Sequence, residues 1–191
     1  MVRVAFICED DAGKKIIETQ NFRELLEENN LQLILPVYNA KGKGNLTEDN
    51  VKGLVSSALD NGAERIFLLT DMDQDVCVTR TKEQLIIDEA CTIVVCKKAI
   101  ESWFLADTNA LSALLKRNEY FDSPEEPSHP FDVINELHKN SHNGRGISKA
   151  ILAIKMVGEG FSVMAAANHN KCSSARYFAD TIRKLGDKKK I

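Results

Sequence analysis

The first hundred residues alternate short apolar runs with longer amphipathic or polar stretches. The apolar runs occupy residues 2–8, 31–38, 64–70 and 91–96, and each has the length of a β-strand. The segments between them predict helices over residues 12–30, 47–62 and 79–90. Strands that are apolar at consecutive positions and alternate with helices are typical of a parallel sheet covered on both faces. The pattern therefore predicts an α/β fold with a mostly parallel sheet.

The pattern changes after the fourth predicted strand. Residues 97–117 predict a helix, residues 118–130 hold three of the four prolines and predict a loop, and the remainder predicts shorter helices. We expect no further strand in this part. The chain should thus comprise an α/β core over residues 1–106 and a helical C-terminal extension over residues 107–191, packed together as a single globular unit.

Three aspartates at alternate positions follow the third predicted strand, in the segment LTDMDQD: Asp71, Asp73 and Asp75. Crowded carboxylates repel one another and resist leaving water, so such a cluster usually serves a divalent cation. An EF-hand calcium loop is excluded, because its sixth and twelfth positions require Gly and Glu and are Val76 and Lys82 here. The alternative is an acidic loop that only caps the next helix.

Other polar residues are expected near these aspartates. The carboxyl ends of parallel strands lie at one edge of the sheet, which is where ligands bind in such folds. Glu9 follows the first predicted strand, and Lys97 and Lys98 follow the fourth. Glu9 with Asp71 and Asp73 would form a hard, all-oxygen site suited to Mg²⁺ or Mn²⁺.

Lysines supply the candidate phosphate-binding groups. Lys41 and Lys43 alternate with glycines in the segment NAKGKGN, a flexible basic loop that lacks the spacing of a Walker motif. Lys97 and Lys98 are candidates for the same role at the end of the fourth strand. The alternative for all of these lysines is an ordinary solvated surface.

Several segments together resemble the Toprim domain of topoisomerases, bacterial primases and overcoming-lysogenization-defect nucleases. They are FICED with Glu9, LTDMDQD with Asp71 and Asp73, and the spacing of strands and helices between them. The segments KKAIESWFLAD, with Glu101, GRGISKAILAIKMVGEGFSV and SSARYFADTIRKL resemble a bacterial family of small stand-alone Toprim-like proteins. At one position the chain departs from the pattern, because Asp10 stands where Toprim domains usually have Gly.

The resemblance implies a Toprim-like, Rossmann-type sheet and a Mg²⁺- or Mn²⁺-dependent nuclease, acting in a defence or mobile-element system. Asp71 and Asp73 would hold the metal, with Asp75 and Glu101 as further ligands. Glu9 would act as the general base or complete a second metal site, so the expected catalytic residues are Glu9, Asp71 and Asp73.

Two other functions remain open from the sequence. The acidic residues after the first and third strands are also typical of a signalling receiver domain that accepts phosphate on Asp71, although Cys96 ends the fourth strand where a receiver has Ser or Thr. Because of Asp10, a catalytically silent module that binds nucleic acid or a protein is the other alternative.

Composition adds limits on location and partners. The net charge of −3 argues against a strong basic field over the whole chain, so a nucleic-acid partner would be bound by local patches. No run approaches the roughly 18 apolar residues of a membrane span, and the first residues are too acidic for a signal peptide. We expect a cytoplasmic protein with no membrane partner, whose oligomeric state the sequence leaves open.

Overall fold

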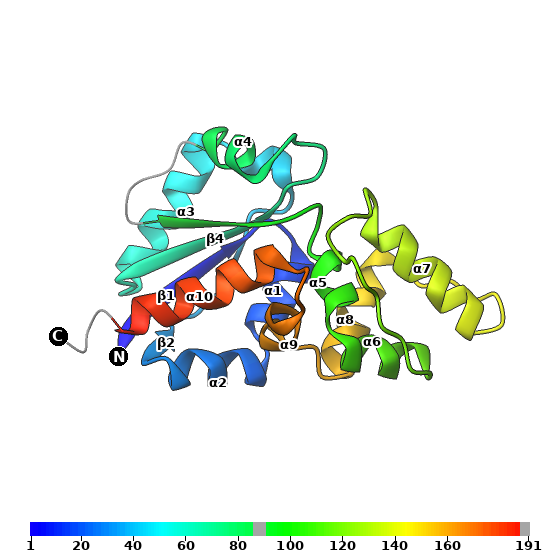
Figure 1. The fold of residues 1–191 in the computed structure, drawn as a ribbon. Helices are drawn as coiled ribbons and strands as arrows, with labels where there is room; N and C mark the ends of the chain where they lie inside the picture. Colours follow the sequence, from blue (N-terminus) through cyan, green and yellow to red (C-terminus); the bar gives the residue numbers. More distant parts are fainter. Residues whose placement is uncertain (86–90, 188–191) are drawn as a thin grey trace.

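A five-stranded sheet forms the centre of the computed structural model, which describes residues 1–85 and 91–187 (Figure 1). The strands run in the order β2-β1-β4-β5, and β3 also pairs with β1. Every pairing is parallel. The strands are β1 (Val2–Cys8), β2 (Leu31–Leu33), β3 (Tyr38–Asn39), β4 (Arg65–Asp71) and β5 (Cys91–Cys96). The predicted α/β fold with a mostly parallel sheet is confirmed.

The apolar run over residues 31–38 forms two short strands instead of the predicted single one. β2 pairs with the first half of β1, and β3 pairs with the end of β1 at Ile7 and Cys8. Between β2 and β3 the peptide bond from Leu35 to Pro36 is cis. Proline has no N–H to donate to a strand ladder, so the pairing is interrupted here.

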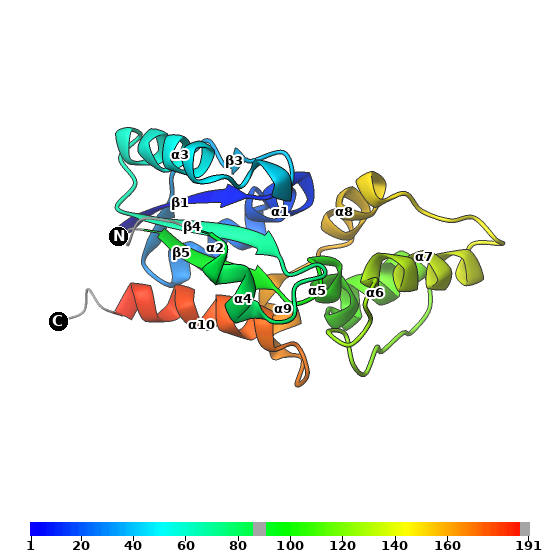
Figure 2. The same ribbon diagram turned by 90° about the horizontal axis from the view of Figure 1, so that it is seen from above.

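Helices cover both faces of the sheet (Figures 1 and 2). On one side lie α1 (Asp11–Ile17), α2 (Gln20–Glu28) and α10 (Ser173–Asp187), and on the other lie α3 (Glu48–Asp60) and α4 (Val78–Glu83). The predicted helix over residues 12–30 is divided in two because the Thr19 hydroxyl caps α2 through the Phe22 N–H. Of the predicted helix over residues 79–90, the last five residues lie outside the described part.

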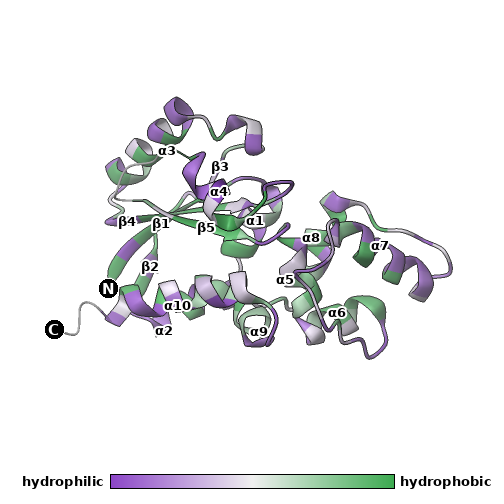
Figure 3. Cartoon of the chain, turned by 45° about the horizontal axis from the view of Figure 1, so that its top comes forward, coloured by the Kyte–Doolittle hydropathy of each residue, from purple (hydrophilic) through white to green (hydrophobic). Residues whose placement is uncertain are grey.

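Alternate residues of each strand enter two separate apolar cores. Phe6 of β1 and Phe67 of β4 lie in the core beneath α1, α2 and α10, while Ile7 and Leu68 lie in the core beneath α3. The strands are accordingly mainly hydrophobic in Figure 3, and hydrophilic residues gather on α3, α4 and the loops. Burial on both faces explains why the strands are apolar at consecutive positions.

The last helix, α10, returns to the sheet and completes the larger core. The ring of Phe178 in α10 packs edge-on against Phe6 and Phe67, at centroid distances of 6.2 and 6.0 Å. It also stacks on Trp103 at 5.6 Å. Residues from the two ends of the chain thus share one aromatic cluster.

The remaining helices gather beyond the carboxyl edge of the sheet (Figure 1). They are α5 (Glu101–Ala106), α6 (Thr108–Leu115), α7 (Pro130–Ser141), α8 (Lys149–Gly158) and α9 (Val163–Asn168). The predicted helix over residues 97–117 is broken because Asp107 caps α6, with its Oδ1 accepting from the Ala110 N–H. No helix in residues 1–85 or 91–187 has the length and apolar character needed to cross a membrane.

Candidate functional site

Glu9 and Asp71 meet at the carboxyl edge of the sheet, at the ends of the adjacent strands β1 and β4. Glu9 Oε2 accepts hydrogen bonds from the Thr70 hydroxyl at 2.5 Å and from the Asp71 N–H at 3.1 Å. Asp71 Oδ1 accepts a hydrogen bond from the Ile100 N–H at 2.9 Å. Ile100 directly precedes α5, so this bond brings Asp71 to the start of the helix that carries Glu101. Segments after three strands therefore converge, as the parallel topology predicts.

Asp71 and Glu101 are almost fully buried, with 7% and 1% of their surfaces exposed. Burial raises the pKa of the Asp71 carboxyl well above its ordinary value, and the nearby charges of Glu101 and Glu9 raise it further. Burial also raises the pKa of Glu101, although Lys149 opposes the shift. The pKa of Glu9 is raised by burial too, against the hydrogen bonds from Thr70 and Asp71. Burial disfavours the charged form of each of these carboxylates, and a bound cation would offset this cost in free energy.

Glu101 has one oxygen paired and one unpaired. Its Oε1 lies 3.3 Å from the Nζ of Lys149, the first residue of α8. Its Oε2 is buried and has no hydrogen-bond partner in the described part of the chain. A buried carboxylate oxygen without a donor is costly, and such atoms in native proteins often mark a site for an ion or a water.

Asp73 and Asp75 lie in the loop after β4 and turn toward Lys43. The Lys43 Nζ lies 3.2 Å from Asp73 Oδ2 and 3.1 Å from Asp75 Oδ2. It also donates to the carbonyl oxygens of Asp71 and Met72. Partial burial lowers the pKa of Lys43, but its bonds to the two aspartates outweigh this and raise the pKa above its ordinary value.

Asp75 is held by further donors besides Lys43. The Thr81 hydroxyl donates to its Oδ2 at 2.9 Å, and Gln84 Nε2 donates to its Oδ1 at 3.2 Å. The bond from Thr81, followed by that from Lys43, lowers the pKa of Asp75. Asp75 therefore has the contacts of a residue that fixes the loop, whereas the half-buried Glu9 and the buried Asp71 and Glu101 form an acidic cluster.

The backbone around Asp73 adopts an unusual conformation. Asp73 has a φ of 52° and Lys98 a φ of 68°, both in the left-handed region that side chains disfavour. The Asp73 N–H donates to the Lys98 carbonyl at 2.7 Å, which ties the loop after β4 to the loop after β5. Strained residues of this kind cluster at functional sites.

The four lysines predicted to bind phosphate differ in their surroundings. Lys43 contacts the aspartates, and Lys97 Nζ lies 3.5 Å from Glu125 Oε2. Lys41 is exposed in the same loop as Lys43, and this loop is anchored by the Gly42 N–H, which donates to the Glu9 carbonyl at 2.7 Å. Lys98 lines a cavity that Asp73 and Glu101 also line. Of the four, Lys98 is the one whose position beside the carboxylates suits a phosphate.

Asp10 does not need the conformational freedom of the glycine that the Toprim pattern has at this position. Its φ is −137°, which any residue adopts. Its Oδ1 caps α1 by accepting from the N–H groups of Ala12 and Gly13, both at 3.0 Å. Gly13 packs against Cys8 and Leu69, where a Cβ would approach to 3.3 Å.

The carboxylates do not form a ready-made metal cage. Within residues 1–85 and 91–187, no three His, Cys, Asp or Glu side chains are grouped so that they could hold a metal ion. Ammonium groups of Lys43 and Lys149 are paired with the acids instead. The residues that fit a hard cation best are Asp71 and Glu101, because both are buried and Glu101 Oε2 lacks a partner.

Thr70 is a site residue that the sequence analysis missed. Its hydroxyl fixes the orientation of Glu9 from a position 61 residues away in the sequence. Only the pairing of β1 with β4 brings the two together. The available signal was a polar residue at the end of an apolar strand, directly before Asp71, and that signal alone does not identify a partner.

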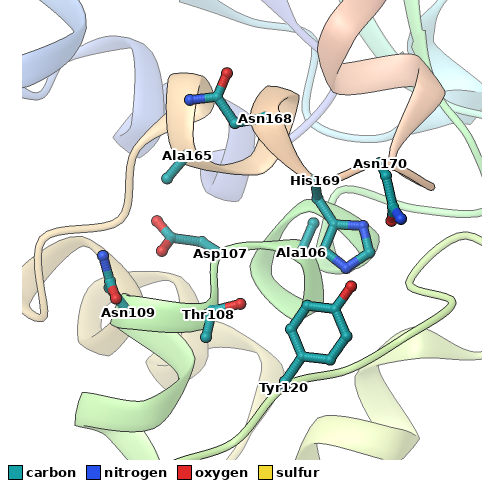
Figure 4. A pocket seen from close by; sticks show the side chains of 9 residues that line it. All are labelled: Ala106, Asp107, Thr108, Asn109, Tyr120, Ala165, Asn168, His169 and Asn170. Atoms are coloured by element: carbon teal, nitrogen blue, oxygen red, sulfur yellow. The ribbon is translucent and has the colours of Figure 1, made fainter.

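A second pocket, of about 440 Å³, lies between α6 and α9 (Figure 4). Tyr120 and His169 stack on one side at a centroid distance of 5.2 Å, with Asn109 and Asn168 across from them. His169 Nε2 bonds the Phe121 carbonyl, and its Nδ1 accepts from the Lys171 N–H. The histidine nitrogens are thus already engaged, and this pocket lacks the unpaired acid of the first site.

Comparison of the chain with protein-family models, with curated proteins and with solved structures found no match.

Proposed function

We propose that the protein hydrolyses phosphodiester bonds in nucleic acid with Mg²⁺ or Mn²⁺, as a cytoplasmic nuclease. The observation that carries this proposal is the acidic cluster at the carboxyl edge of the sheet, made of the half-buried Glu9 and the buried Asp71 and Glu101. Three carboxylates of raised pKa are costly to keep without a cation. Binding of a divalent ion would offset this cost in free energy.

The roles of the residues follow from their hydrogen bonds. Asp71 and Glu101 would hold the ion, which when bound polarises the phosphate and lowers the pKa of the attacking water. Glu9 Oε2 accepts hydrogen bonds from Thr70 and Asp71, whereas its Oε1 accepts no hydrogen bond within the described residues. That oxygen is the candidate proton acceptor, and its raised pKa brings it closer to the working range of a general base.

Asp73 can bind the metal ion only if its ion pair with Lys43 opens. The 3.2 Å ion pair is partly exposed on both sides, so the cost of opening it is about 1 kcal/mol or less. Asp75, with its three donors, remains a loop-fixing residue. We therefore rank Asp71, Glu101 and Glu9 ahead of Asp73 as the reacting set.

A catalytically silent module that binds nucleic acid or a protein is the second candidate. It is favoured by the ammonium groups of Lys43 and Lys149, which lie within 3.3 Å of Asp73, Asp75 and Glu101. The receiver-like function is less well supported, because the proposed phosphate acceptor Asp71 is 7% exposed and its Oδ1 is bonded by a backbone N–H.

The test is calorimetric titration with Mg²⁺ and Mn²⁺, combined with cleavage assays on supercoiled plasmid and on labelled linear single strands. Asp71→Asn is the informative variant, because an amide oxygen can still accept from the Ile100 N–H while the charge is lost. Asp60→Asn, at the exposed end of α3, is the matched control. We expect metal binding and cleavage of at least one of these substrates in the wild type and the control, and neither in Asp71→Asn.

Two outcomes contradict the nuclease. Metal binding without cleavage of any plasmid or single strand would favour the silent module. Absence of metal binding to the wild type would show that protonation and the ion pairs with lysine are sufficient to neutralise the carboxylates. The proposal would then be withdrawn.

A further inference from the structure

A cavity of about 180 Å³ opens beside the acidic cluster, between the loops after β4 and β5 and the first residues of α7 and α8. Asp73 and Glu101 line it on the side of the sheet, and Lys98 and Lys149 also contribute to its walls. Pockets that enclose a whole drug-sized ligand measure roughly 300–1,000 Å³. This cavity therefore suits a small group, not a complete heterocyclic ligand.

The N-terminus of α7 forms the far wall of the cavity. His129, Pro130, Phe131 and Asp132 are all lining residues, and no side chain caps this helix. Proline has no N–H, and the N–H groups of Asp132 and Val133 bond the His129 carbonyl. The Phe131 N–H has no partner in the described part of the chain. A twelve-residue helix with an open N-terminus carries a partial positive charge that favours anions.

The charges around the cavity leave Lys98 available. Asp73 is paired with Lys43, and Glu101 is paired with Lys149. Lys98 makes no ion pair with the residues that the structure describes. The unpaired ammonium and the open end of α7 oppose a single remaining carboxylate, Asp132, among the lining residues. An anion entering here would meet donors on two sides.

The cavity is also lined by Glu101, the acid of the cluster that has an unsatisfied oxygen. Glu101 lines it with a side chain that is 2% exposed, and its buried Oε2 has no partner among the described residues. This oxygen favours a cation, whereas Lys98 and the N-terminus of α7, which line the same cavity as Glu101, favour an anion. A phosphate group accompanied by a divalent ion satisfies both requirements, because Mg²⁺ usually binds through one or two carboxylates together with substrate phosphate oxygens.

We propose that this cavity binds the phosphomonoester at the end of a nucleic-acid strand, which rests on the proposed nuclease function and makes strand ends its substrate class. A terminal phosphate carries more charge than an internal phosphodiester and projects as a single small group. Both properties match a small cavity with one open helix end and one free ammonium group. An internal phosphodiester would require the strand to enter and leave through the same opening.

The experiment is a fluorescence anisotropy measurement with internally labelled single-stranded oligonucleotides of one sequence. They carry a phosphate at the 5′ end, at the 3′ end or at neither end, and Ca²⁺ replaces Mg²⁺ and Mn²⁺ so that a divalent ion is present while the ions proposed to support cleavage are absent. For one of the two phosphorylated forms we expect an affinity about fivefold or more above that of the unphosphorylated form. Inorganic phosphate at constant ionic strength should reduce this preference in the wild type.

Lys98→Gln should abolish the preference, whereas Lys155→Gln should retain it. Lys155 lies on the exposed side of α8, so Lys155→Gln removes the same charge at a position outside the cavity. Thermal melting checks that both variants are folded. Equal affinity for all three oligonucleotides, or a preference that survives Lys98→Gln, would overturn the proposal.

A mononucleotide arm separates the two sources of a phosphomonoester. If thymidine 5′-monophosphate competes as strongly as the phosphorylated oligonucleotide, the cavity serves single nucleotides and the strand-end proposal is refuted. Failure of the nuclease proposal is seen separately, as the absence of Mg²⁺ binding in calorimetry or the absence of cleavage of both plasmid and linear strands. Nicking without any end preference leaves the nuclease standing and removes only the phosphate cavity.

Discussion

Replacing Glu101 with Gln should make the metal-free protein more stable while weakening Mg²⁺ binding. The wild-type carboxylate is 1% exposed, has one oxygen without a partner, and lies close enough to Asp71 to raise its pKa. An amide of the same shape removes the charge and supplies an NH₂ donor for a neighbouring carboxylate. The residue would thus be retained for function at the expense of stability.

The magnitude follows from two opposing contributions. A buried polar atom without a partner costs about 1–3 kcal/mol, and more when it is charged. The ion pair that the variant loses contributes about 0–1 kcal/mol, because Lys149 is 52% exposed. We therefore expect the free energy of unfolding to rise by about 1–2 kcal/mol, which corresponds to about 2–8 °C in Tm for a chain of this size.

The assay is urea unfolding followed by circular dichroism at neutral pH in EDTA, repeated with Mg²⁺. Glu28→Gln, on the exposed side of α2, is the control and should change the free energy of unfolding by less than about 0.5 kcal/mol. Added Mg²⁺ should stabilise the wild type and the control but not Glu101→Gln. Destabilisation of Glu101→Gln by more than about 1 kcal/mol would refute the view that this carboxylate is unsatisfied.

The stabilisation should depend on pH in a defined direction. Because the pKa values of Asp71 and Glu101 are raised in the folded chain, the folded state holds their protons more tightly than the unfolded state. Their contribution to stability is complete below the ordinary values of 3.8 and 4.5 and is lost as pH rises through the folded pKa values. The advantage of Glu101→Gln over the wild type should therefore widen as pH rises above 4.5, the ordinary pKa of a Glu carboxyl. A constant difference would contradict the raised pKa.

Two further variants test the lysine at the site and the packing of α10. Lys149→Met should raise the affinity for Mg²⁺ a few-fold in calorimetry, because its ammonium group no longer competes for Glu101 Oε1. Stability in EDTA should fall by about 1–3 kcal/mol, because the buried Glu101 then loses the partner of its other oxygen; unchanged or weaker Mg²⁺ binding would argue against competition. Gly186→Ala should lower the free energy of unfolding by about 1–3 kcal/mol, because its Cβ would lie 1.9 Å from the Asn29 carbonyl oxygen. Gly158→Ala, with nothing within 4 Å of its Cβ, should be neutral or stabilising by up to about 1 kcal/mol in the same urea titration.

The sequence was sufficient to predict the three long strands and the class of fold. β1, β4 and β5 are continuous apolar runs because both faces of the sheet are covered, and that signal survives in a single sequence. The division of residues 31–38 was not predicted, although the run contains Pro36, which has no N–H to donate to a strand ladder. Nor was the return of α10 to the sheet, because periodicity identifies an apolar helix face but not the surface that it covers.

At the site, topology was more informative than residue type. The rule that ligands bind at the carboxyl edge brought Glu9 and Asp71 together correctly in space. It did not distinguish Asp71, which is buried, from Asp75, which fixes its loop through Thr81 and Lys43. The partners of the lysines likewise depend on long-range contacts. The metal and phosphate roles of these residues stay predictions.

The position of Phe178 bears on how the chain folds as it is synthesised. Its ring fills the space between Phe6, Phe67 and Trp103, yet it belongs to the last helix of the described chain. On the ribosome the strands of the sheet emerge before α10, and the apolar face that α1 and α2 cover in part lacks the rest of its cover until residues 173–187 have been made. The larger core therefore closes only late in translation, and nascent chains that stop before α10 present an aromatic surface that chaperones would recognise.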